Sequence, residues 1–533
     1  MEPTYKPELA QSKDLIYAAS PKESKKIRKL KTISLIGLCI ALLMISFDDT
    51  VVNIALPKIQ AGLNLDVWQL QWVLTANALP AASLVMSTGR LGDIYGHKKI
   101  FLCGLIAFFI GSLICGLAPN LEILIVGRAL QGMGDAALLQ ASLTIIADTF
   151  PKDDEKAKAI SIWTAASGVA LVSGPVIGGF LVDNFGWGSI FFINLPLSIL
   201  VFWLISTVVK EVKNDNKQAV DLPGFIFSII FLASLVYALT ESVKISHLNV
   251  LLFLGISGFS LLVFLLIESR SRNPMLPLSL FRNITFTTVN FVSVLVFFTL
   301  VGLLFVFSLF LQEVQGYSPA SAGLRFLPFN GAFITASLVS GWLVARMDSR
   351  KTITVGLILG CIATLIFFGI DAQSEYRTIM GGFIVFGFAC GLTIPPMSTV
   401  AMSSVSKSQA GIASAIHGTC NRIGWILGIT LQGNILTQYL SADFRQTLVS
   451  WGIPSNHANH DKLIADALHN SRLVPEELPV SISQSTYIEG VNRAFVSGFH
   501  AVVLVACLAL IFGTVLVVKF VASTPKELPN EIS

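Results

Sequence analysis

SFDDTVVNIALP, residues 46–57, is the stretch that decides the fold, because two adjacent carboxylates, Asp48 and Asp49, stand inside a segment apolar enough to cross a bilayer. On insertion scales an Asp at the centre of a spanning helix costs about 2.5–3.5 kcal/mol, whereas each Leu, Ile, Phe or Val contributes only about 0.3–0.6 kcal/mol. Two acids in one span therefore indicate a functional role.

The rest of the chain is equally apolar. Of its 533 residues 53% are hydrophobic and 13% are charged, and the mean hydropathy is +0.73. Soluble domains carry about 25% charged residues, so the composition predicts an all-α polytopic membrane protein. Fourteen apolar runs are long enough to span: residues 33–57, 68–89, 99–118, 121–147, 157–183, 190–209, 222–241, 248–268, 285–312, 322–346, 351–371, 377–402, 410–437 and 494–521.

The basic residues predict the orientation. Most of the 36 Lys and Arg residues lie in both tails and in alternate connections between the spans, which places both termini in the cytoplasm by the positive-inside rule. The first apolar run is too long for a cleaved signal peptide. The long connection 438–493 lacks Cys and Asn-x-Ser/Thr acceptors, which favours a bacterial plasma (inner) membrane.

A weak internal repeat indicates the domain organisation. The connections 89–99 and 341–351 both open on Gly-x-Leu-type sequence and close on paired basic residues, as expected if two halves are parallel repeats of six helices. We expect a basic cytoplasmic tail (1–32), a six-helix bundle (33–209), a linker with two extra helices (210–284), a second six-helix bundle (285–521) with the outer loop 438–493, and a cytoplasmic tail (522–533).

Metal and cofactor chemistry is not indicated. The seven cysteines lie in apolar stretches at unrelated spacings, and His457, His460 and Asp461 stand in the polar outer loop with nothing to complete a ligand set. No Gly-x-x-x-x-Gly-Lys-Ser/Thr sequence occurs, so ATP is not expected as the direct drive. We expect no metal, no cofactor, no nucleic acid and no enzyme activity.

A helical wheel separates the two acids of the first span. At 100° per residue, Asp49 shares a narrow sector with Ser46, Thr50 and Asn53, whereas Asp48 points nearly opposite. Desolvation favours the protonated form of a carboxylate and a nearby cation favours the charged form, so either acid could exchange a proton as access changes. Interhelical hydrogen bonding for packing alone is the alternative role.

Two later spans also carry polar faces. Arg128, Gln131, Asp135 and Ser142 share one face of the fourth span, where Arg128 could stabilise a carboxylate of the first span, pair with Asp135 through an intervening residue, or form a purely structural ion pair. In the thirteenth span His417 and Asn421 are stacked at i,i+4 beside Arg422. A lone His is more often packed than pH-responsive.

Ordered motifs along the chain resemble the major facilitator superfamily, and within it the fourteen-helix drug:proton antiporter branch of EmrB/QacA-like exporters. The motifs are Asp48-x-Thr50-Val51-Val52-Asn53-x-Ala55-Leu56-Pro57, Gly89-x-Leu91-Gly92-Asp93-x-x-Gly96-x-Lys98, Arg128-x-x-Gln131-Gly132-x-Gly134, Gly174-Pro175-x-x-Gly178-Gly179, Phe191-Phe192-Ile193-Asn194-Leu195-Pro196, Asp221-x-x-Gly224 and Gly316-Tyr317-Ser318-Pro319. The chain departs from the pattern at Ile94 and His97, where basic residues are usual, and at Asp135, where a small residue is usual.

The resemblance implies two six-helix bundles plus two inserted central helices, and proton-coupled export of lipophilic compounds, cationic ones among them, by alternating access. It selects Asp48 as the proton or substrate carboxylate, whereas the wheel favours Asp49, and both remain candidates with Arg128 and Asp135. The polar faces of the spans offer possible cavity residues (Thr50, Asn53, Gln131, His417, Asn421, Arg422), whereas the resemblance implies a gating loop (Gly89, Gly92, Asp93, Gly96, Lys98) and antiporter-type helix packing (Gly174, Pro175, Gly178, Gly179).

The partners expected are a small lipophilic substrate, protons and membrane lipid around a monomeric transport unit. If the source is Gram-negative, a periplasmic adaptor and an outer-membrane channel are further candidates. Two other functions fit the same sequence: a dedicated exporter of one metabolite, siderophore or lipid, and a membrane receptor or scaffold in which the acids are structural.

Overall fold

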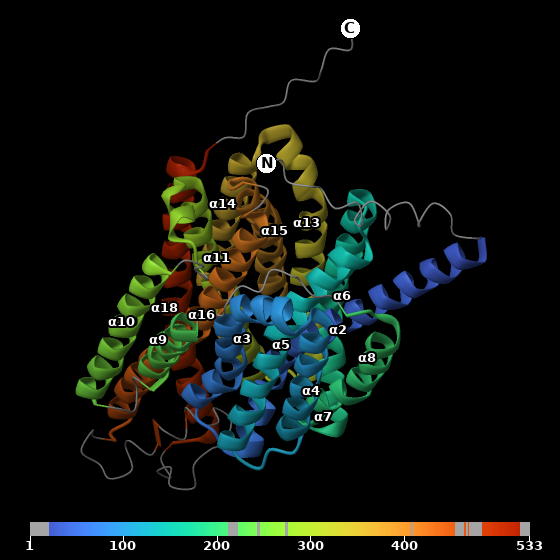
Figure 1. Ribbon diagram of the computed structural model, residues 1–533. Helices are drawn as coiled ribbons and strands as arrows, with labels where there is room; N and C mark the ends of the chain where they lie inside the picture. Colours follow the sequence, from blue (N-terminus) through green and yellow to red (C-terminus); the bar gives the residue numbers. More distant parts are fainter. Residues whose placement is uncertain are drawn as a thin grey trace.

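A computed structural model describes residues 21–211, 222–241, 246–271, 276–406, 409–453, 463–464, 467 and 482–522. Within these residues the chain is helical, with short turns and no strand, which confirms the all-α prediction. Figure 1 shows long helices gathered into two groups, with the blue and cyan first half packed against the yellow to red second half.

The first bundle follows the predicted order of spans. It consists of α2 (Pro21–Leu63), α3 (Val67–Tyr95), α4 (His97–Gly116), α5 (Leu121–Thr149), α6 (Asp153–Phe185) and the broken helix α7 (Ser189–Phe192) with α8 (Asn194–Val208). The break at Ile193 lies one turn before Pro196, which has no N–H to donate to the preceding turn. Helix α2 packs against α6 and α8, while α5 packs against α3 and α4.

The second bundle repeats this arrangement. It consists of η2 (Leu278–Arg282), α11 (Ile284–Leu309) continued by the π-helical segment η3 (Phe310–Val314), α12 (Pro319–Arg325), α13 (Leu327–Met347), α14 (Ser349–Phe368), α15 (Tyr376–Ser403), α16 (Ala410–Ser450) and α18 (Gln484–Phe520). Pro328 follows the junction of α12 and α13 and accounts for that break as Pro196 does for the other.

The two extra helices are α9 (Leu222–Thr240) and α10 (His247–Arg270). They pack against each other, and α9 also contacts α3 of the first bundle and α16 of the second. In Figure 1 the green pair lies beside both. The insertion therefore covers a seam where the two bundles meet.

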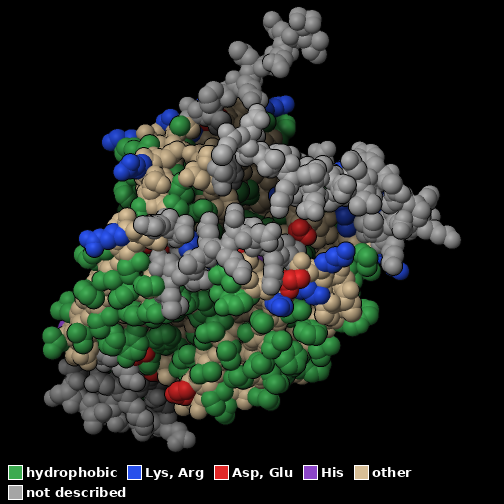
Figure 2. Space-filling model, viewed as in Figure 1, with side chains coloured by type: hydrophobic (Ala, Val, Ile, Leu, Met, Phe, Trp, Pro, Cys, Tyr) green, Lys and Arg blue, Asp and Glu red, His purple; other side chains and the backbone are tan. Residues whose placement is uncertain are grey.

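Composition alone identifies most of the spans. Among the described residues, eleven helices are long and apolar enough to cross a membrane. The remaining predicted spans correspond to α3, α5 and α16, which have 29, 29 and 41 residues. These helices carry polar side chains that are buried inside the protein. Figure 2 shows a broad hydrophobic surface on the lower part of this face, with Lys and Arg mostly above it.

The helices next to the expected outer loop are longer than the hydropathy pattern indicated. Helix α16 continues to Ser450 and α18 begins at Gln484, so both enter the segment 438–493. His457, His460 and Asp461 lie outside the described residues. We call outer the end of the molecule where α2 ends and α3 begins, following the predicted topology, and inner the opposite end.

Candidate functional site

Asp48 lies inside the first bundle. Its side chain is 1% exposed, and its Oδ2 pairs with Nη1 of Arg128 on α5, which is also 1% exposed. Its Oδ1 accepts hydrogen bonds from Nε2 of Gln131 at 3.1 Å and from Nδ2 of Asn194 at 3.3 Å. Both carboxylate oxygens are thus satisfied by neighbours from the same bundle.

Arg128 is held equally firmly. Its Nε donates to the carbonyl oxygen of Val73 at 2.8 Å and its Nη1 to Oε1 of Gln131 at 2.9 Å, while the guanidinium carbon lies 5.9 Å from the centre of the Phe191 ring. Ser112 accepts from Gln131 at 2.9 Å and joins α4 to the network. This buried, hydrogen-bonded ion pair joins five helices, α2, α3, α4, α5 and α8.

Asp49 faces the other bundle. Its Oδ2 lies 3.2 Å from Nη1 of Arg422 on α16, and the two side chains are 14% and 17% exposed. The Arg422 guanidinium also lies 5.4 Å from the centre of the Trp425 ring. This ion pair connects the two bundles, and the two acids predicted to point in opposite directions do occupy different environments.

Asp135 is buried at 2% exposure and its carboxylate is only half satisfied. Oδ2 accepts from Nδ2 of Asn77 at 2.9 Å, whereas Oδ1 has no hydrogen-bond partner among the described residues. Asp49, Arg422 and Asp48 lie within electrostatic range of this carboxylate. Gly132 allows this arrangement, because a Cβ there would overlap the backbone carbonyl of Asn77, so α3 and α5 approach closely.

The polar residues of the fourth span therefore contact two different helices, α2 and α3. Arg128 and Gln131 reach Asp48, as one of the alternatives for Arg128 proposed, and Asp135 reaches Asn77. Ser142 is directed to its own helix and donates to the carbonyl oxygen of Leu138. Arg128 does not pair directly with Asp135 in the described contacts.

Helix α16 divides its polar residues between two directions. His417 is hydrogen-bonded through both ring nitrogens, to Oδ1 of Asn290 and to Oγ of Ser398, each at 3.1 Å. Asn421 accepts a hydrogen bond from Ser293. These contacts hold His417 and Asn421 within their own bundle, which matches the structural alternative for His417, and leave Arg422 as the residue that reaches the other bundle.

Thr50 and Asn53 bond mainly to the backbone of their own helix. The Thr50 hydroxyl donates to the carbonyl oxygens of Ser46 and Phe47, at 3.1 and 3.0 Å, and Nδ2 of Asn53 donates to that of Asp49 at 3.3 Å. The Asn53 carbonyl in turn accepts from Ser308 of the second bundle. Their side chains thus support the helix that carries Asp49.

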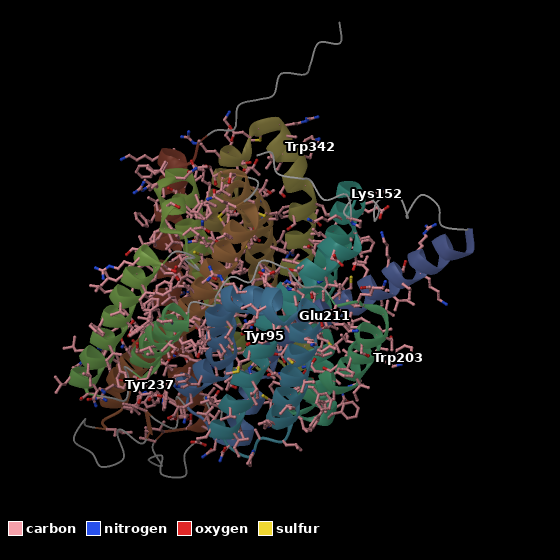
Figure 3. The ribbon with its side chains drawn as sticks, viewed as in Figure 1. Tyr95, Lys152, Trp203, Glu211, Tyr237 and Trp342 are labelled. Carbon is pink, nitrogen blue, oxygen red and sulfur yellow. The ribbon has the colours of Figure 1, made fainter. Side chains whose placement is uncertain are left out.

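The expectation of a loop at residues 89–99 is wrong for most of its length, because α3 continues to Tyr95 and α4 begins at His97, with only Gly96 between them. This junction is anchored to the end of α8 and the residues that follow it. Lys98 donates through Nζ to the carbonyl oxygen of Ser206 at 2.7 Å and through its backbone N–H to Glu211 at 3.1 Å. Asp93 lies 3.2 Å from Nε2 of His97. Gly96, at φ +106°, has no room for a Cβ beside Glu211, and a Cβ at Gly92 would overlap the His97 ring. Figure 3 shows Glu211 beside this inner end of the first bundle.

The Gly-Pro motif of α6 lies where three helices meet. A Cβ at Gly174 or Gly178 would overlap Thr50 or Val51 of α2. On the opposite side, a Cβ at Gly179 would lie 2.5 Å from the carbonyl oxygen of Pro319 and 2.6 Å from Cα of Ala320. The motif therefore packs α6 against its own bundle and against α12 of the other bundle.

Hydrogen bonds reinforce this outer contact between the bundles. The Ala320 N–H donates to Asp183 at 3.0 Å, Gln312 of η3 to the Ile54 carbonyl at 3.0 Å, Asn330 to the Leu171 carbonyl at 2.9 Å, and Gln71 to Asn434 at 3.1 Å. The bundles thus meet outward of the Asp49–Arg422 pair. Figure 3 places Lys152 and Trp342 at the opposite, inner ends of α6 and α13.

We expect Gly179→Ala to open this contact. Overpacking costs about 1–3 kcal/mol, which shifts a two-state equilibrium by about 5- to 150-fold. Labelling of an Ala320→Cys reporter by a membrane-impermeant maleimide should rise in that proportion, whereas Gly168→Ala on the same helix, where a Cβ meets nothing within 4 Å, should leave it unchanged. Equal labelling of both variants would show that α6 and α12 need no close contact.

Several site residues were not predicted as such. The sequence places Asn194 within a motif without a predicted role, and its pattern does not distinguish Ser112, Asn77, Asn290, Ser293 and Ser398 from other residues of the spans. Each is a small polar residue in an apolar span, and each hydrogen-bonds one of the predicted residues. Isolated Asn residues within spans were the signal available in the sequence.

Sequence comparison gives a consistent family. The sequence model of the Major Facilitator Superfamily matches residues 38–429. The chain is 34% identical to the multidrug resistance protein Stp of Mycobacterium tuberculosis, covering 91% of each chain. It is 31% identical to the methylenomycin A resistance protein of Bacillus subtilis, over 77% of this chain and 89% of that one, and 30% identical to the drug efflux pump JefA of M. tuberculosis, over 77% and 81%.

Solved structures share the fold. A bacterial homologue of the human lysosomal transporter Spinster, in an inward-facing and unoccupied conformation, superposes with a TM-score of 0.61 at 19% identity, covering 93% of this chain and 99% of that one. A D-xylose–proton symporter superposes with a TM-score of 0.60 at 14% identity, over 93% and 99%. At these identities the likeness concerns the fold alone.

Proposed function

This chain belongs to the major facilitator superfamily of membrane transporters and is not an enzyme, and we propose that it exports lipophilic compounds, cationic ones among them, in exchange for protons. The names of its relatives, which concern resistance to and efflux of drugs, support export as the direction. The contact of the bundles on the outer side supports alternating access, because this contact must open to release a substrate outward.

The charges at the centre of the molecule support the proton coupling. Asp48 is neutralised by Arg128 and Asp49 by Arg422, so the third acid, Asp135, is surplus. A buried carboxyl group without a cation of its own favours the neutral, protonated form. The observation that carries the proposal is the surplus carboxyl group of Asp135. One of its oxygens has no hydrogen-bond partner in the described residues. The group lies near the Asp49–Arg422 ion pair, which connects the two bundles.

We assign the roles accordingly. Asp135 holds the exchangeable proton. The Asp49–Arg422 ion pair is intact only while the bundles are in contact at this place, because it must break when they move apart. A cationic substrate near Asp49 would stabilise the charged form of Asp135 and release its proton. Asp48, which the family resemblance selects, keeps the first bundle intact rather than titrating.

A dedicated exporter on the same scaffold is the second candidate. A relative whose name refers to resistance to one compound, methylenomycin A, supports it. Membership of a transporter family weighs against the receptor or scaffold function. A panel of dyes, drugs and single metabolites tested for efflux from an overexpressing strain separates one substrate from many.

The remaining assignments belong to the same proposal. The protein is integral to the membrane, and we place it in a bacterial plasma membrane with both termini in the cytoplasm, as a monomeric transport unit. A periplasmic adaptor and an outer-membrane channel would join it only in a Gram-negative source.

Proteoliposomes with an imposed pH gradient test the coupling. We expect the wild-type protein to drive tetraphenylphosphonium against its gradient in exchange for protons, and Asp49→Asn and Arg422→Gln each to slow this flux, since each leaves a partly buried charge unpaired. The double variant should recover part of the rate. The absence of any pH-driven flux across the panel would overturn the antiporter proposal, and additive losses in the double variant would overturn the role of the pair.

A further inference from the structure

An apolar cavity of about 210 Å³ lies between the inserted helices and both bundles. Its walls come from α3, α9, α10, α16 and the segment of η2, and include Ser83, Ser228, Phe264, Leu265, Thr419 and Ile423. Neither Asp49 nor Arg422 is among the residues that line it. Neither the charge balance nor the outer contact requires a cavity at this place.

Helix α9 is tied to both bundles at its outer end. At the outer end, Trp72 of α3 donates to Glu241 at 2.9 Å, and Asn434 of α16 donates to the Leu239 carbonyl. Tyr237, labelled in Figure 3, stands between Trp72 and Phe253 of α10, with ring centres 6.2 and 4.5 Å away. Toward the inner end, Ser228, Phe231 and Leu232 of α9 line the cavity.

Each hydroxyl group among the described lining residues donates to its own helix. Ser83 donates to the Leu79 carbonyl at 3.0 Å, Ser228 to the Phe225 carbonyl at 2.8 Å and Thr419 to the Ala415 carbonyl at 3.0 Å. Each hydroxyl is therefore directed to its own helix. A water molecule needs two to four polar partners, so water is a poor occupant of this space.

The surroundings and the size identify a better occupant. Leu265, one of the lining residues, is 38% exposed, so the cavity reaches the surface of α10. The volume is below the roughly 300–1,000 Å³ of pockets that enclose drug-sized ligands, and the largely apolar lining suits an acyl chain. We propose that this cavity holds one acyl chain of a membrane phospholipid, inserted between the α9–α10 pair and the seam of the two bundles.

The acyl chain lies where it can affect transport. Ala82 on α3 and Ile416 on α16 both line the cavity, so the acyl chain contacts the two bundles at once. Motion of one bundle against the other changes the shape of this space. Binding of the acyl chain does not depend on the proposed proton coupling, and it is measurable without a substrate.

Photolabelling tests the proposal. The full-length protein is reconstituted in nanodiscs with phosphatidylethanolamine that carries a diazirine within one acyl chain, irradiated, digested and analysed by mass spectrometry. We expect adducts on cavity residues such as Phe264 and Ile423. Ser228→Phe, which fills the cavity, should reduce these adducts several-fold, whereas Ile226→Phe, on the same helix but 46% exposed to the membrane face, should not.

The controls separate the alternatives. Thermal unfolding of each variant shows that it is folded, and Thr419→Phe fills the cavity from α16 should Ser228→Phe fail to fold. Adducts confined to exposed surface residues of α10 such as Leu262 would mean that the cavity is empty. Unchanged labelling in both Ser228→Phe and Thr419→Phe would place the lipid elsewhere. Displacement of the label by excess tetraphenylphosphonium would make the occupant a transported compound. Each of these three results overturns the lipid proposal.

Discussion

Asp135→Asn is expected to abolish proton-driven transport while leaving a folded protein that still binds substrate. The amide has nearly the shape of the protonated acid and can still accept the hydrogen bond from Asn77, but it cannot exchange a proton. With an imposed gradient of one pH unit, one exchanged proton supports about a tenfold substrate gradient. In the variant we expect this gradient to collapse to that of protein-free liposomes.

Its control lies on the same helix. Glu122, in the first turn of α5, is exposed, so Glu122→Gln removes one carboxylate from α5 without touching the centre and should pump like the wild type. Substrate exchange at equal pH on both sides should survive in Asp135→Asn, because exchange needs no net proton transfer. Normal pumping by Asp135→Asn would remove Asp135 from the coupling.

Arg128→Met is expected to destabilise the protein more than any other change at the site. It leaves Asp48 buried without its cation, and breaking a buried ion pair by removing one partner costs about 3–5 kcal/mol. Thermal unfolding in detergent, followed by tryptophan fluorescence, should show a large drop in the midpoint. Transport should fall with the amount of folded protein.

The double variant Asp48→Asn with Arg128→Met distinguishes a structural pair from a proton site. Replacing both members of a buried ion pair is often nearly neutral for stability, so the double variant should regain most of the midpoint and a measurable pH-driven flux. A double variant that is stable but fully uncoupled would instead make Asp48 the proton carrier, as the family resemblance suggests.

The fold was largely predictable because the membrane imposes one dominant pattern. A span needs about 20 apolar residues, and runs of that length located the helices, including α3, α5 and α16 despite their polar faces. Helix ends were less predictable. The apolar sequence of a span ends at the edge of the bilayer, but the helix can continue. Helices α16 and α18 extend into the polar segment 438–493.

The site was predictable as a set of residues but not as a set of pairs. A helical wheel separated Asp48 from Asp49, since that follows from local geometry. Their partners depend on how distant helices pack: Arg128 is 80 residues from Asp48, and Arg422 is 373 residues from Asp49. No spacing in the sequence relates these positions. That Asp135 is a carboxyl group without a cation of its own follows only from the ion pairs seen in the structure.

Substrate-induced proton release from the purified protein tests the central proposal most directly. Tetraphenylphosphonium is added to the detergent-solubilised protein in weakly buffered solution with a pH indicator, and binding is followed in parallel by tryptophan fluorescence. We predict proton release by the wild-type protein and by Glu122→Gln, and binding without release by Asp135→Asn. Binding without proton release by the wild type, or undiminished release by Asp135→Asn, would contradict the proposed exchange.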